Sequence, residues 1–146
     1  MKIYIAGKGR KSNYKGGILY PDDGKDTRGG VCFFYNENNI NVENQIFMFN
    51  RASKDGGSIF FYNCKTIHIE KCTFICNFAK WGGEIYFERC ENIELCNNKF
   101  LLNFALRDGG AISFSHCNKI NIKQNNLFLG NTAIRSCNNV EFHECT

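Results

Sequence analysis

Short runs of alternating apolar and polar residues recur at the same place in each of four units of the chain. In the first run of each unit two apolar positions lie two residues apart: Cys32 and Phe34, Ile59 and Phe61, Ile85 and Phe87, Ile112 and Phe114. A second run repeats this spacing: Ile40 and Val42, Ile67 and Ile69, Ile93 and Leu95, Ile120 and Ile122. A two-residue period puts the apolar members on one face of a β-strand and does not match a helix. The pattern therefore predicts short strands that each bury one face.

Four glycine pairs set the period of the repeat: Gly29-Gly30, Gly56-Gly57, Gly82-Gly83 and Gly109-Gly110. Successive pairs are separated by 27, 26 and 27 residues. Short strands within a fixed period of this size are typical of a solenoid, in which equivalent strands stack in parallel about 4.8 Å apart. We predict an all-β fold, a single-stranded parallel β-helix of four to five circuits, here called rungs, of about 27 residues each. The general preference of parallel crossovers predicts a right-handed winding.

Each unit closes with the motif Phe-x-x-Asn-x-Ala, whose asparagines are Asn50, Asn77, Asn103 and Asn131. Stacked rungs bring these side chains into one column. We expect an internal amide ladder at a bend, where asparagine also tolerates a left-handed backbone. Contact of these asparagines with a ligand is the alternative.

The two motifs, Gly-Gly-x-Ile and Phe-x-x-Asn, alternate in phase over residues 29 to about 133. The first reads GGSI, GGEI and GGAI, with GGVC departing, and the second reads FMFN, FICN, FLLN and FLGN. This combination resembles the repeat of the chlamydial polymorphic membrane proteins and similar β-helix repeats of other organisms. The resemblance implies the surface-exposed passenger of an autotransporter, with a role in adhesion. The chain shows neither an export signal nor a membrane barrel. The lack of a signal peptide and the cysteine usage favour an intracellular location, whereas the resemblance favours the cell surface.

The repeat divides the chain into residues 1–28, interpreted as an N-terminal cap or atypical rung, and residues 29–146, which hold the β-helix repeats. Residues 1–28 contain the only proline, Pro21, and an off-phase Gly16-Gly17 pair. After Ala133 the glycine pair is missing. Aligning Cys137 with Cys117 makes the last rung shortened or truncated, so we expect either a closing rung or part of a longer protein.

Composition narrows the function only slightly. The chain is 43% hydrophobic with 14 phenylalanines, enough for a small continuous core. The net charge is +4 and no long run of like charges occurs, so nucleic-acid binding is not predicted. No apolar stretch approaches the roughly 18 residues of a membrane-spanning helix, so no membrane segment is predicted.

Nine cysteines follow the repeat, and most fall into two columns: Cys64, Cys90, Cys117 and Cys137, then Cys72 and Cys145. No Cys-x-x-Cys pair is present, which disfavours a zinc ribbon. Cysteines stacked at about 4.8 Å are close enough to bridge, but side chains in register point the same way. We expect a reduced ladder in the core; disulfides are the alternative, and no metal site or cofactor is predicted.

Catalytic residues are not predicted either. Pectin-degrading enzymes use this fold with clustered acids, but here only Asp55 and Asp108 recur, each just before a glycine pair with Trp81 between them. We expect both aspartates to lie in solvated corners. The histidines, His68, His116 and His143, fall in different columns, and Ser113 and Ser115 lack a base that the sequence identifies.

Aromatic residues occupy outward positions of the first strand in three of the four units, whereas the fourth unit has Ser113 and Ser115 there. The candidate binding residues are Phe33, Tyr35, Phe60, Tyr62 and Tyr86. Such a face is covered by other parts of the chain, meets a protein partner, or stacks on sugar rings. We therefore predict a non-catalytic binding or adhesion module, or a fragment of a larger surface repeat protein, with a protein or glycan partner. A polysaccharide lyase or hydrolase, supported by fold analogy alone, and a purely structural repeat segment are the alternatives.

Overall fold

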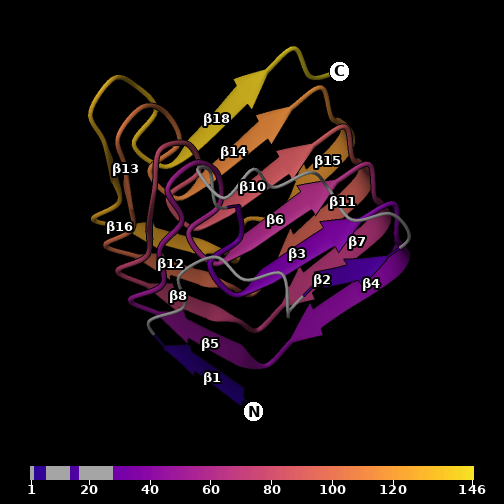
Figure 1. Cartoon of the computed structure of the whole chain (residues 1–146), viewed down its shortest axis with the longest axis horizontal. Helices are drawn as coiled ribbons and strands as arrows, with labels where there is room; N and C mark the ends of the chain where they lie inside the picture. Colours follow the sequence, from indigo (N-terminus) through magenta and orange to yellow (C-terminus); the bar gives the residue numbers. More distant parts are fainter. Residues whose placement is uncertain (1, 6–13, 17–27) are drawn as a thin grey trace.

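The computed structural model describes residues 2–5, 14–16 and 28–146, whose regular structure consists of β-strands alone. The strands wind into a parallel β-solenoid, with β1 (Lys2–Ile5) at one end of the stack and β18 (Val140–His143) at the other (Figure 1). All strand pairs between successive rungs are parallel and in register, for example β6 with β10 and β7 with β11. The predicted β-helix with a period near 27 residues is confirmed.

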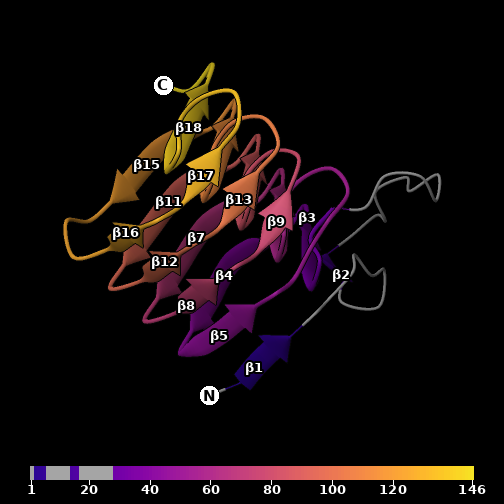
Figure 2. The ribbon, with the colours of Figure 1, turned by 90° about the vertical axis from the view of Figure 1, so that its left-hand side faces the viewer.

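Four stacks of strands form the walls of the solenoid (Figures 1 and 2). Sheet 1 contains β2 (Tyr14–Gly16), β3 (Cys32–Tyr35), β6 (Ile59–Tyr62), β10 (Ile85–Glu88), β14 (Ile112–Ser115) and β18. Sheet 2 contains β4 (Asn38–Glu43), β7 (Lys65–Glu70), β11 (Glu91–Cys96) and β15 (Asn118–Ile122). Sheet 3 contains β1, β5 (Gln45–Met48), β8 (Thr73–Ile75), β12 (Lys99–Leu101) and β16 (Leu127–Leu129). Sheet 4 contains β9 (Phe78–Ala79), β13 (Phe104–Ala105) and β17 (Thr132–Ala133).

Columns of like residues fill the interior between these sheets. Ile40, Ile67 and Ile93 pair in register and are buried, whereas Ile120, on the edge strand β15, is only partly buried. The phenylalanines that follow the glycine pairs stack ring on ring, with centroid separations of 4.8 to 5.0 Å from Phe34 to Phe114. The period-two columns of the sequence are therefore the core of the protein.

The glycine pairs serve two separate purposes. Gly56 has a φ of 64°, a left-handed conformation that glycine adopts without steric cost. Gly57 lies so close to the next rung that an added Cβ would stand 2.2 Å from the carbonyl oxygen of Gly83. The first glycine therefore permits the bend, and the second permits the close approach of successive rungs.

The Phe-x-x-Asn asparagines form the predicted internal ladder. The main-chain N–H of Asn50 donates to Oδ1 of Asn77 at 2.9 Å, and the same bond joins Asn77 to Asn103 and Asn103 to Asn131. Each amide nitrogen from Asn77 onward donates to a main-chain carbonyl of the preceding rung, such as that of Phe47 at 3.0 Å from Asn77. These bonds satisfy the buried polar groups of the bend.

The left-handed residue at this bend is not the asparagine, contrary to the sequence prediction. The positive φ values belong to the residues just before it, for example 56° at Phe49 and 53° at Cys76. The asparagine side chain points inward to bond the next rung, so the exposed or half-exposed residue before it makes the bend. A left-handed residue other than glycine costs roughly 1–2 kcal/mol, which the ladder must offset.

The last rung has a different register from the one predicted. The N–H of Cys117 donates to Sγ of Cys145 at 3.4 Å, so the cysteine column runs from Cys64 through Cys90 and Cys117 to Cys145. Gly110 donates to the carbonyl of Cys137, and Val140 pairs with Ile112. Cys137 and Asn138 thus replace a glycine pair, and β18 starts the next rung. Aligning Cys137 with Cys117, and Cys145 with Cys72, was wrong.

All nine cysteines lie in the described residues and are free thiols.

Residues 1–28 are described only in part. β1 pairs with β5 in sheet 3, and β2 pairs with β3 in sheet 1. Gly17, Pro21 and the remainder of the expected N-terminal cap lie outside the described residues, so the cap remains a prediction.

Candidate functional site

The aromatic residues on the outer face of sheet 1 are not uniformly exposed. Phe33, Tyr35, Tyr62 and Tyr86 are half-buried, but Phe60 has no exposed surface. The Phe60 ring lies between those of Phe33 and Tyr86, at centroid distances of 4.9 and 5.5 Å, and the guanidinium of Arg28 lies 5.8 Å from its centre. The expected exposed aromatic face is therefore interrupted at Phe60.

A shallow cavity of about 240 Å³ opens beside Tyr86. Its lining comes from three places: Arg28, the corner residues Lys54, Asp55 and Trp81, and Tyr86 and Glu88 of β10. Tyr86 and Glu88 both point outward because they lie two residues apart on one strand. Tyr86 is the only one of the five candidate binding residues in the lining. Trp81 was not predicted as a site residue, although its position between two recurring aspartates was a usable signal.

Asp55 lies in the wall of this cavity and is buried, with 4% of its surface exposed, so the expected solvated corner is wrong. Its carboxylate accepts a hydrogen bond from Nε of Arg28 at 3.2 Å. Burial raises the pKa of Asp55 to about 6, although the charges of Arg28 and Lys54 act in the opposite direction. This carboxyl group therefore titrates close to neutral pH.

Asp108, the equivalent residue two rungs later, is also buried rather than solvated. Both Nε and Nη2 of Arg135 donate to its carboxylate, the former at 3.1 Å, and Oγ of Ser136 donates at 2.7 Å. Burial opposes ionisation, but these hydrogen bonds and the nearby arginine charges outweigh it and lower the pKa of Asp108. Asp108 is thus a carboxylate held in an ion pair.

A chain of polar side chains leads from Ser115, near Tyr86, to the end of the solenoid. Burial, followed by the charge of Asp55, raises the pKa of Tyr86 far above its usual value, and Ser115 acts in the opposite direction. Oγ of Ser115 lies 2.9 Å from Nδ1 of His116, whose Nε2 lies 2.5 Å from Oε2 of Glu144. Sequence reasoning found no base for Ser115, because the contact to Glu144 depends on the register of the last rung. Since Ser115 is buried, it does not present an exposed nucleophile.

Glu84 is a third buried carboxyl group, and its burial was not predicted from the sequence. It has no exposed surface and occupies the variable position of the Gly-Gly-x-Ile motif. Oε2 accepts a hydrogen bond from Oγ of Ser58 at 2.9 Å, and Oε1 has no hydrogen-bond partner among the described residues. Burial raises the pKa of Glu84 well above its usual value, so burial favours the uncharged acid at this position.

Comparisons of the chain with protein-family models, curated proteins and solved structures found no match. Among the described residues, no helix has the length and apolar character needed to span a membrane. The parallel β-solenoid defines the class of the protein, and inferences on its function rest on the site geometry.

Proposed function

We propose that the protein is a non-catalytic binding module of the adhesion type and that the cavity beside Tyr86 binds one ring of a neutral glycan. The mixed lining of this cavity carries the proposal: Trp81 and Tyr86 offer ring surfaces, and Asp55 and Glu88 offer acceptors. A pyranose ring has apolar C–H faces and a rim of hydroxyl donors, which aromatic rings and carboxylates complement. The resemblance of the repeats to those of the chlamydial polymorphic membrane proteins supports the adhesion role.

The size of the cavity favours a ring within a longer chain. Its volume of about 240 Å³ is below the roughly 300–1,000 Å³ of typical small-molecule sites. A glycan would therefore place one ring here and lie across the outer face of sheet 1, where Tyr62 and Tyr35 stack at 5.3 Å. We expect a dissociation constant on the order of millimolar for a single ring, with tighter apparent binding for repeated ligands.

The single tryptophan of the chain allows a direct test, because Trp81 lines the cavity. Titration with a panel of neutral oligosaccharides should shift or quench the fluorescence of Trp81. Glu88→Gln should weaken binding about tenfold, since it removes a charged acceptor. The control Phe49→Asn removes an exposed aromatic residue outside the cavity and should bind normally. Unchanged fluorescence together with no heat of binding across the panel would refute the proposal.

A second candidate function is glycoside hydrolysis, which one observation favours. The carboxyl group of Asp55, with a pKa of about 6, shares the cavity with the carboxyl group of Glu88. A protonated acid beside a second carboxyl group is the arrangement that glycosidases use. Chromatography of a bound oligosaccharide after incubation separates the two functions. Products that form mainly below about pH 6 and vanish in Asp55→Asn indicate hydrolysis, whereas binding without products supports the binding module.

A further inference from the structure

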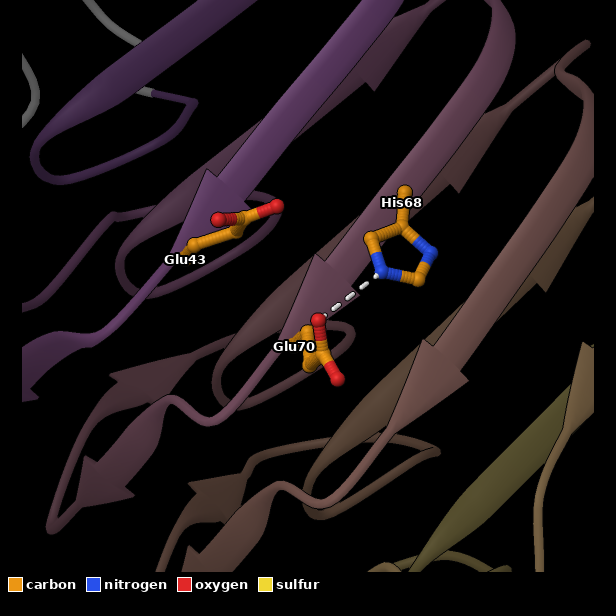
Figure 3. Close-up of side chains that lie close together, drawn as sticks. All are labelled: Glu43, His68 and Glu70. Carbon is orange, nitrogen blue, oxygen red and sulfur yellow. Dashed lines mark hydrogen bonds and ion pairs between the residues drawn. The ribbon is translucent and has the colours of Figure 1, made fainter.

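The outer face of sheet 2 carries a cluster of two glutamates and a histidine (Figure 3). Glu43 of β4 pairs in register with Glu70 of β7, and His68 of β7 pairs with Glu94 of β11. Parallel stacking therefore sets two carboxylates side by side at one strand spacing, which is electrostatically unfavourable. In the described part of the chain, neither Glu43 nor Glu70 forms an ion pair with a lysine or arginine.

The donor atoms of three side chains converge at this place. One atom each of Glu43, His68 and Glu70 lies within 4.8 Å of the other two, and Figure 3 shows the imidazole and both carboxylates on the same side of the sheet. Nε2 of His68 is 3.4 Å from Oε2 of Glu70. These separations allow one small cation to contact all three groups after modest side-chain rotation.

Glu94 supplies the second observation. Its Oε1 lies 3.3 Å from Nδ1 of His68, and its charge is balanced by Nζ of Lys123 at 3.4 Å. A carboxylate on Nδ1 favours the tautomer with the proton on that nitrogen. This tautomer leaves the lone pair of Nε2 on the side of Glu70, free to bind a metal ion. This carboxylate–histidine arrangement is the usual outer support of a metal-binding imidazole.

We propose that Glu43, His68 and Glu70 form a surface site for a divalent transition-metal ion, with Glu94 as the residue that orients His68. One imidazole and two carboxylates suit ions from Mn²⁺ to Zn²⁺, with Zn²⁺ held more tightly than Mn²⁺. Three protein ligands leave a position for water or for a group of a partner molecule. The site is independent of the glycan-binding proposal.

Co²⁺ is a suitable probe because its visible absorption reports the ligands. Chelator-treated protein titrated with Co²⁺ should bind one equivalent with a nitrogen and oxygen spectrum, and Zn²⁺ should displace it. His68→Gln should weaken binding about a hundredfold, and Glu94→Gln about tenfold. The control His143→Gln removes another histidine that contacts a glutamate and should leave the affinity unchanged.

Two results would overturn the site. The first is an absence of binding at millimolar Co²⁺, which would leave His68 as a histidine paired with glutamates. The second is a strong near-ultraviolet band from a cobalt–thiolate bond that disappears in Cys96→Ser and persists in His68→Gln. Cys96 is the thiol to test because it lies in the next rung, in register with Glu70. Equal unfolding temperatures of the metal-free variants exclude misfolding as the cause of lost binding.

Discussion

Asp55 and Asp108 occupy equivalent corners before a glycine pair, and both are buried, yet burial has opposite outcomes for their charge. Among the described residues, Asp55 accepts one side-chain hydrogen bond, from Arg28, whereas Asp108 accepts bonds from Nε and Nη2 of Arg135 and from Oγ of Ser136. Burial favours the neutral acid, and only Asp108 has enough donors to reverse this preference. In a solenoid, the side chains of the adjacent rung therefore decide the chemistry of a repeated position.

The largest effect on stability is expected from a carboxylate introduced into the core, where it has no hydrogen-bond donor. Ile93→Asp places a charge at a core position with 1% exposure. We expect loss of the folded state, because an unpaired buried charge costs more than about 5 kcal/mol. Circular dichroism and urea unfolding measure this. The control Asn121→Asp, at an exposed position of the neighbouring strand β15, should fold normally, and a folded Ile93→Asp protein would contradict the buried ladder.

Asp55→Asn should stabilise the protein at alkaline pH. The folded state raises the pKa of Asp55 from 3.8 to about 6, so its contribution is most favourable below pH 3.8 and is lost as the pH rises through 6. At pH 8 ionisation therefore costs the native state up to about 3 kcal/mol. Asparagine avoids this cost and still offers Arg28 an oxygen. Urea midpoints at about pH 4 and pH 8 should show a gain at pH 8 only; an equal change at both values would contradict the raised pKa.

The same substitution at Asp108 should have the opposite sign. Its lowered pKa means that the carboxylate contributes stability above pH 3.8 and loses it as the pH falls through the folded pKa. Asp108→Asn weakens the bonds to Arg135 and Ser136 and should destabilise the protein by about 1–2 kcal/mol at pH 7. Denaturant unfolding of the two asparagine variants side by side is the measurement. A stability change of the same sign in both variants at pH 8 would show that the two corners are alike.

Lys54→Gln should give the smallest effect. The charge of Lys54 lowers the pKa of Asp55, so its removal should raise that pKa further. Carboxyl chemical shifts followed by NMR through a pH titration measure the change. Lys119→Gln, on the outer face of sheet 2, is the matched control and should leave Asp55 unaffected.

The interior of the solenoid could be predicted from the sequence because stacking demands repetition. The Phe, Ile and Asn columns recur at fixed spacing, and each forms the ladder that its period indicated. The register of the last rung could not be found in this way. Cys137 and Asn138 replace the glycine pair, so the sequence alignment had no glycine pair to fix the register and matched the wrong cysteines.

The candidate sites were less predictable because they depend on residues that differ between rungs. Trp81 and Tyr86 meet only when the corner folds against the outer face of sheet 1. Similarly, the cluster of Glu43, His68 and Glu70 needs the relative register of β4 and β7. The burial of Glu84 also has no sequence signature, because the variable position of its motif holds serine or alanine in neighbouring rungs.

The in-register stacking of rungs also has a consequence for how the chain folds. From residue 28 onward, register partners in successive rungs lie 26 to 28 positions apart in the sequence, as in the asparagine ladder. Closing each of these rungs therefore carries nearly the same loop entropy. Folding can start at a central rung and spread in both directions, as a one-dimensional array does. Amide hydrogens of β7 and β11 should then exchange last, and those of β18 among the first.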